Sequence, residues 1–126
     1  MPRLKTCLWA TAIGYTAIIM IGGGGAKLIG YQMAHISFAV LGLPAWFGYF
    51  IGVAEVLGGI ALFISPLRRY AAAGLFAIMA GAIYFHVFYT PLTFGIPAAL
   101  TFLACAYLVL WPAKDVIGTA QASPAA

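Results

Sequence analysis

The chain has 126 residues, of which 65% are hydrophobic and 6% are charged. An average soluble domain is roughly 45–50% apolar and about 25% charged, so the composition excludes a soluble globular enzyme, a disordered chain and a disulfide-stabilised scaffold. It leaves an integral membrane protein of one domain. The net charge of +4 does not indicate nucleic-acid binding, because the basic residues form no continuous stripe.

The first predicted membrane helix covers about residues 6–27. Residues 6–26 contain no charged side chain, and a membrane helix needs about 20 mostly apolar residues. A basic start before an apolar run is also typical of a signal peptide, but we expect a retained helix. The four glycines at 22–25 weaken a helix by about 1 kcal/mol each relative to alanine. They indicate either a tightly packed or unwound helix end, or backbone that is exposed to a ligand.

Residues 28–43 are too few to cross a bilayer and too apolar to lie free in water. We expect a short helix there, in the membrane interface or in a re-entrant segment. The second predicted span covers 45–64 and follows Pro44, a residue that is tolerated where a helix begins. Its one charge, Glu55, lies about 16 Å along the helix and therefore near the middle of the bilayer.

Residues 70–113 contain no Asp, Glu, Lys or Arg. The Pro- and Gly-containing stretch 90–97 divides them, because these residues interrupt helices. The third and fourth spans are therefore expected at 70–88 and 96–112, and the small and polar residues 113–126 are expected to form a flexible tail. The whole chain is predicted to be all-α: a single membrane domain, built as a four-transmembrane-helix bundle with an interfacial or re-entrant segment between the first two helices.

The positions of Lys and Arg predict how the chain is oriented. Short cytoplasmic loops of membrane proteins are enriched in these residues. With four crossings, most basic residues fall on one side of the membrane: Arg3, Lys5, Arg68, Arg69 and Lys114. After Lys27, the 28–44 connection contains none, and neither does the 90–97 turn. We expect a bacterial inner-membrane protein with both termini in the cytoplasm.

Glycines on two spans predict where helices pack. Small residues allow membrane helices to approach closely. Gly48, Gly52 and Gly59 share one face of the second span, and Gly74 and Gly81 share one face of the third. We interpret both faces as packing seams, which would also serve a homo-oligomer or a membrane-protein partner.

Charged side chains within a membrane usually pair with one another or mark a functional path. Lys27, Glu55 and His86 are predicted to meet in one cavity in the outer half of the bundle, with Tyr84 and Tyr89 beside them. Two interpretations of Lys27 and Glu55 remain open. They form either a structural interaction, as an ion pair or a protonated and hydrogen-bonded Glu55, or a site for a ligand or a proton. His86 is either an interior side chain with ordinary partners or a part of that site.

The remaining reactive residues give no catalytic pattern. Cys7 and Cys105 form no CxxC motif and are expected to be buried free thiols, with a disulfide left open if the first and last helices touch. No metal site is expected, because no His, Cys or carboxylate pattern has metal-ligand spacing.

The order of several short motifs resembles the DoxX and DoxX-like membrane protein family, over about residues 4–112. The motifs are Ala26-Lys27-Leu28, Leu41-Gly42-Leu43-Pro44, the stretch from Gly52 through Glu55 to Leu62, Pro66-Leu67-Arg68-Arg69, Ala71 to Leu75, and Tyr84-Phe85-His86. The resemblance implies a four-helix membrane bundle and an association with redox biology, since relatives include a small subunit linked to thiosulfate oxidation with quinone as acceptor. It also implies that Lys27, Glu55 and His86 match the polar pattern of the family.

Three functions remain as hypotheses. The first is a small accessory or subunit protein of a redox-related membrane system, without catalytic activity of its own. The second is a quinone-binding redox component with its site at Lys27, Glu55, His86 and Tyr84, and quinone is the one cofactor candidate. The third is a carrier or binding protein for a small lipophilic molecule.

Overall fold

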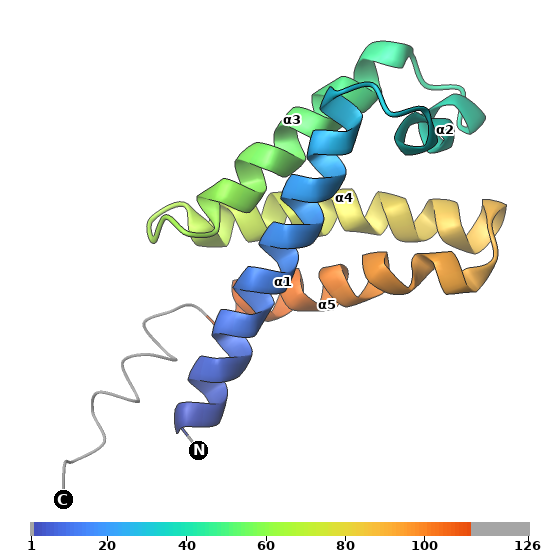
Figure 1. The fold of residues 1–126 in the computed structure, drawn as a ribbon. Coiled ribbons are helices and arrows are strands. Elements are labelled where there is room, and N and C mark those ends of the chain that lie inside the picture. Colours follow the sequence, from blue (N-terminus) through green and yellow to red (C-terminus); the bar gives the residue numbers. More distant parts are fainter. Residues whose placement is uncertain (1, 112–126) are drawn as a thin grey trace, which may run out of the picture.

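The computed structural model describes residues 2–111 as a chain of helices (Figure 1). The elements are α1 Pro2–Leu28, α2 Gln32–Val40, α3 Ala45–Ala61, α4 Arg68–Tyr89, the 3-10 helix η1 Leu92–Gly95, and α5 Ile96–Leu110. No strand occurs within this range, so the predicted all-α class is confirmed. The predicted tail 113–126, with Lys114, lies outside the described residues.

The helices form two antiparallel pairs that are stacked on each other. α1 pairs with α3, and α4 pairs with α5, while α1 also contacts α5 and α3 contacts α4. The two pairs cross obliquely, so that they diverge at the end of the molecule where α2 lies (Figure 1). The N-terminus, the α3–α4 turn and the end of α5 lie toward the opposite end (Figure 1).

The lengths of the helices fit a membrane protein. α1, α4 and the segment Leu92–Leu110 are each long and apolar enough to cross a bilayer. α2 and α3 pass the same test only as a pair bent by 120°, because α3 alone has 17 residues and reaches about 26 Å against a hydrocarbon core of about 30 Å. By length and composition the chain therefore has three spans, or four if the bent pair is one span.

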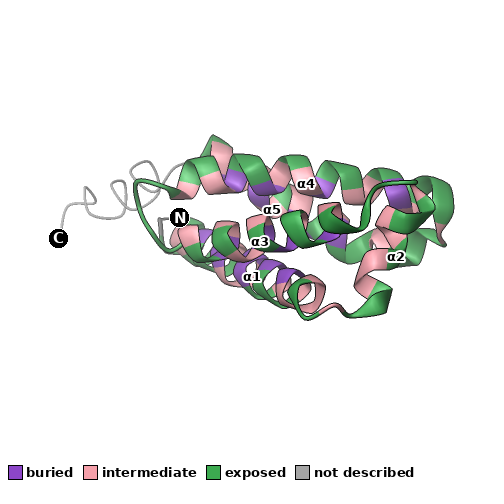
Figure 2. Cartoon of the chain, turned by 90° about the horizontal axis from the view of Figure 1, so that it is seen from above, coloured by how far each residue is buried: buried purple, intermediate pink, exposed green. Residues whose placement is uncertain are grey.

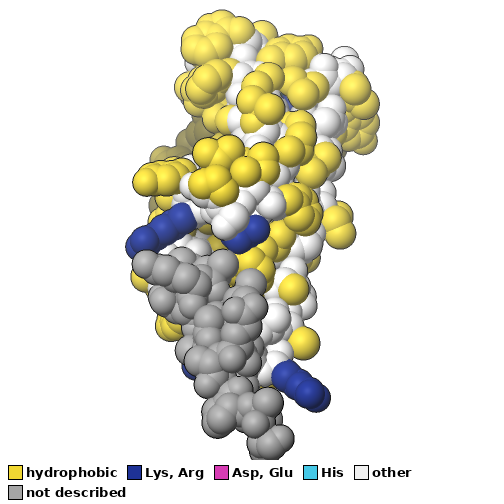
Figure 3. Space-filling model, turned by 90° about the vertical axis from the view of Figure 1, so that its left-hand side faces the viewer, with side chains coloured by type: hydrophobic (Ala, Val, Ile, Leu, Met, Phe, Trp, Pro, Cys, Tyr) yellow, Lys and Arg dark blue, Asp and Glu magenta, His cyan; other side chains and the backbone are white. Residues whose placement is uncertain are grey.

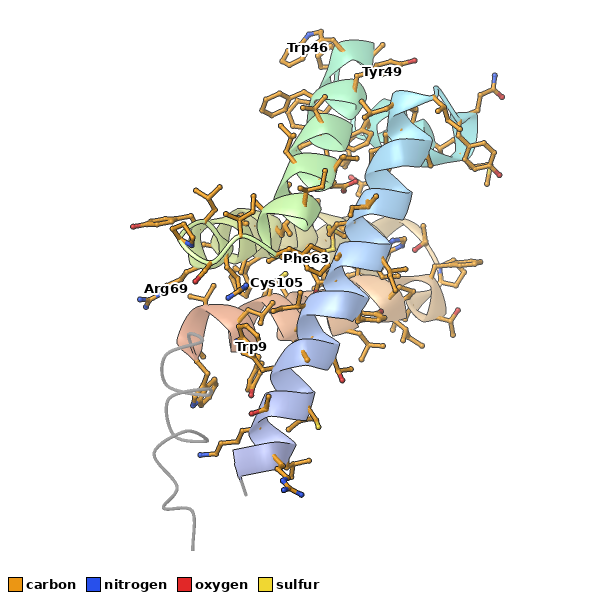
Figure 4. The ribbon with its side chains drawn as sticks, turned by 60° about the vertical axis from the view of Figure 1, so that its left-hand side comes forward. Trp9, Trp46, Tyr49, Phe63, Arg69 and Cys105 are labelled. Atoms are coloured by element: carbon orange, nitrogen blue, oxygen red, sulfur yellow. The ribbon has the colours of Figure 1, made fainter. Side chains whose placement is uncertain are left out.

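The main buried cluster joins α1, α4 and α5 with Leu62, the residue that directly follows α3. Its members are Trp9, Ile13, Met20, Leu62, Ala72, Leu75, Met79, Ala98, Cys105 and Leu108. Trp9 and Cys105 come together in it from opposite ends of the chain (Figure 4), and the Arg68 guanidinium lies 4.6 Å from the Trp9 ring centroid. Both cysteines are free. Cys105 is buried as expected, whereas Cys7 is exposed on α1, which corrects the expectation for that thiol.

The glycine run in α1 has its explanation in the contact with α3. A Cβ atom added at Gly24 would lie 2.6 Å from the carbonyl oxygen of Gly52, and one at Gly52 would lie 2.9 Å from Cβ of Lys27. Only glycine allows the two backbones to come this close. Further along the pair, a Cβ at Gly59 would lie 2.8 Å from the Ile21 side chain. α1 stays helical through all four glycines, so its end is tightly packed and not unwound.

The glycines of α4 behave differently from those of α3. Cβ atoms added at Gly74 and Gly81 would meet no atom within 4 Å, and both residues are exposed. The helices described here therefore do not pack against these two positions, and a seam with a second chain stays a prediction. The physical reason is that α4 turns Leu75 and Met79 toward the buried cluster, which leaves the two glycines together on another face of the helix.

Candidate functional site

The charged side chains within the helices form an ion pair. Lys27 in the last turn of α1 places its Nζ 2.8 Å from Oε2 of Glu55, in the middle of α3. Glu55 is only 3% exposed. The close approach of the two backbones at Gly24 and Gly52 brings these side chains within reach. A cation at the C-terminal end of α1 also interacts favourably with the helix dipole.

Glu55 lines a cavity of about 880 Å³, on the side where the two helix pairs diverge. α3 and α4 form its walls, and α2 with the connection after it covers it. The apolar lining side chains are Met33, Ile36, Phe38, Val40, Leu41, Leu43, Phe47, Ile51, Ala77, Ile78, Ala82, Phe85 and Phe94. The polar ones are Ser37, Glu55, His86, Tyr89 and Thr90. A mostly apolar space of this size with a few polar groups is typical of a small-molecule site.

His86 is held at the cavity by the end of its own helix. Its Nδ1 lies 2.9 Å from Oγ1 of Thr90, and the Thr90 hydroxyl is 3.2 Å from the carbonyl oxygen of His86. When the hydroxyl donates to that carbonyl, its oxygen accepts from Nδ1–H. In this tautomer Nε2 is a hydrogen-bond acceptor, and no described residue bonds to that atom. His86 thus offers one acceptor to a ligand.

The cavity brings together some of the predicted site residues and not others. It joins Glu55 and His86, with Tyr89 as expected. Lys27 does not line it, and reaches it only through its ion pair with Glu55. Tyr84 does not line it either: it precedes His86 by two residues and so faces another side of α4. Tyr84 is 52% exposed, and its ring packs against that of Phe88 at 4.9 Å.

Sequence reasoning missed the role of the α2 segment as the cover of the cavity. The sequence predicts only a short interfacial or re-entrant helix within residues 28–43, whereas Ile36 and Phe38 of this helix line the cavity. The signal that was available is the pair of glycines at its two ends, Gly30 and Gly42, both of which have positive φ angles. Glycine is the default residue where a chain must adopt such a conformation, so these two positions mark the turns that fold α2 back over α3.

One comparison with known proteins identifies the family of the chain. Residues 11–110 match the model of the DoxX-like family. A search of curated proteins found no match, and neither did a search of solved structures. The matched range includes the ion pair, His86 and every residue that lines the cavity. The chain therefore belongs to the DoxX-like family.

Proposed function

We propose that this chain is a small membrane subunit of a redox-related system and that it binds a quinone in the cavity between α2, α3 and α4. The observation that carries the proposal is the lining of that cavity, a mostly apolar and aromatic space in which Glu55 and His86 are the carboxyl and imidazole groups among five polar residues. Such a space suits a lipophilic molecule that has a small polar head. The family membership supports a membrane protein, and the redox role is our inference.

The residues present fit the chemistry of a quinone. When bound, a quinone supplies two carbonyl oxygens that accept or release protons as it takes up or gives off two electrons. Nε2 of His86 and the carboxylate of Glu55 are hydrogen-bond acceptors, so they would bind the hydroxyl groups of the reduced quinone and take up its protons when it is oxidised. Phe47 and Phe85 also line the space and offer ring surfaces to a flat head group.

An accessory role fits the shape of the chain. Helices occupy most of residues 2–111, and the connections between them are short. Little of the described chain is available to form a separate catalytic site outside the helices. We therefore assign the electron donor or acceptor to a partner protein, with this chain holding the quinone.

Filling the cavity from α4 is expected to weaken binding strongly and leave the fold intact. Gly81 lines the cavity, and a Cβ there meets no atom within 4 Å, so Gly81→Leu places its side chain in the space that the ligand would use. We expect at least tenfold weaker binding of a radiolabelled benzoquinone with a decyl tail, measured in lipid nanodiscs.

The matched control is Gly74→Leu, on the same helix, with equally open surroundings and away from the cavity. It should bind the probe like the wild type. Equal binding by the two glycine variants would contradict the assignment of the site. A wild type that retains a different lipophilic molecule and rejects the quinone would favour the third function, a carrier or binding protein.

Membrane orientation gives a second expected result. Basic side chains occur at the start of α1 and at the α3–α4 turn. Figure 3 shows Lys and Arg side chains on the face of the molecule that it views. We expect this end to lie in the cytoplasm. In a Cys7→Ser background, a membrane-impermeant maleimide added to spheroplasts should label Leu92→Cys and not Leu4→Cys. Both positions are well exposed, at 69% and 58%, and the opposite labelling would reverse the topology.

A further inference from the structure

We infer that α2 is a hinged lid over the cavity and that His35 is the residue that latches it. The inference rests on the proposed use of the cavity as a ligand site, and it concerns how that site opens and closes. Three observations carry it: the backbone at both ends of α2, the loose packing of the helix, and the contacts of His35.

The hinges are Gly30 and Gly42, one on each side of α2. Their φ angles are +78° and +72°, and no other described residue has a positive φ. Glycine reaches both signs of φ at little cost, so these positions can absorb a change in backbone direction. A mobile element needs such freedom at both ends, and here the two glycines flank a single nine-residue helix.

Between the hinges α2 is only loosely packed. It contains no buried residue, and Figure 2 shows only intermediate and exposed positions along it. The large cavity lies on one side, and a second space of about 310 Å³ lies between α2 and α3, lined by Gln32, His35, Ala39 and Tyr49 among others. An element with open space on two sides and few buried contacts separates from the rest at low free-energy cost.

One polar side chain holds the lid closed. Nε2 of His35 lies 2.8 Å from the carbonyl oxygen of Lys27 and donates to it, and the His35 ring packs at 4.7 Å from the ring of Tyr49. Tyr49 extends from α3 on the side where α2 lies (Figure 4). The absence of a side chain at Gly48 makes room for the imidazole, because a Cβ there would overlap the ring.

The latch and the site share a residue. Lys27 accepts the His35 hydrogen bond at its carbonyl and binds Glu55 with its Nζ. A ligand that alters the position of Glu55 therefore acts on the same residue to which the lid is attached. This arrangement couples occupation of the cavity to closure of α2.

The test is to remove the latch without removing the ring. His35→Phe keeps an aromatic contact with Tyr49 and loses the donor to Lys27. A hydrogen bond contributes roughly 0.5–1.5 kcal/mol, so we expect about two- to thirteenfold faster amide hydrogen exchange across residues 31–43, with α4 and α5 unchanged. Dissociation of the decyl benzoquinone probe should accelerate by a similar factor. Gln32→Ala, at an exposed position on the same helix, is the matched control and should change neither rate.

A second variant acts on the hinge alone. Gly42→Ala adds a Cβ that meets no atom within 4 Å, so it only disfavours the closed backbone conformation. It should raise both rates in the same direction as His35→Phe. Unchanged exchange across 31–43 in both variants would overturn the lid, even if the wild type binds the probe. A wild type that binds no probe would overturn the proposed function, while the exchange measurement would still decide whether α2 opens.

Discussion

Lys27→Met is expected to destabilise the protein by about 3 kcal/mol or more. The substitution leaves the Glu55 carboxylate buried without its partner, and breaking a buried ion pair in this way costs about 3–5 kcal/mol. The pair has its atoms at 2.8 Å, and the side chains are 15% and 4% exposed. The measurement is the free energy of unfolding by denaturing detergent from mixed micelles, compared with the wild type.

The double variant Lys27→Met/Glu55→Met should recover most of that loss. Replacing both charges of a buried pair by apolar side chains of similar volume is often neutral or stabilising. A double variant as unstable as Lys27→Met would contradict this account, because the loss would then not come from the unpaired carboxylate of Glu55.

The same double variant separates the structural from the functional interpretation of the pair. It keeps the carbonyl of Lys27 that holds His35 and removes only the charges. If the folded double variant binds the quinone probe as the wild type does, the pair serves the fold alone. We expect binding to fall, because the carboxyl of Glu55 lines the cavity.

Gly24→Leu is the second change with a large expected effect. A Cβ at this position would lie 2.6 Å from the carbonyl oxygen of Gly52 and 2.8 Å from Cγ2 of Val56. The backbone of α3 cannot move away without separating the two helices, so we expect a loss of about 3 kcal/mol in stability, at the upper end of overpacking costs. The measurement is the midpoint of thermal unfolding in a mild detergent.

Gly22→Leu is the control for this prediction. It lies in the same glycine run, and a Cβ there meets no atom within 4 Å. Leucine is a better helix former than glycine by several tenths of a kcal/mol, so this variant should be as stable as the wild type or slightly more stable. Equal destabilisation by the two substitutions would show that the run matters for its flexibility and not for the contact with α3.

Several features followed from the sequence alone because they depend on local composition. An apolar run with almost no charge must leave water, and in a membrane a single segment satisfies its backbone hydrogen bonds only as a helix. This is why the all-α fold was predictable. Lys27 and Glu55 were also found this way, because a charge within an apolar span is costly and calls for a partner.

Other features depended on how the helices are stacked. Helical periodicity places Gly81, Tyr84 and His86 around α4, but it does not say which side of α4 faces a neighbour. The two helix pairs cross obliquely and diverge at one end (Figure 1), so His86 and Gly81 line the cavity and Tyr84 does not. The bend of 120° between α2 and α3 brings His35 to Lys27. This contact depends on the positive φ angles of Gly30 and Gly42 and on the absence of a side chain at Gly48. The sequence by itself therefore determined the class of protein and its charged pair, since both follow from the free energy of placing residues in a membrane. The cavity and its cover were decided only by tertiary packing, because they are spaces between helices and no single segment encodes them.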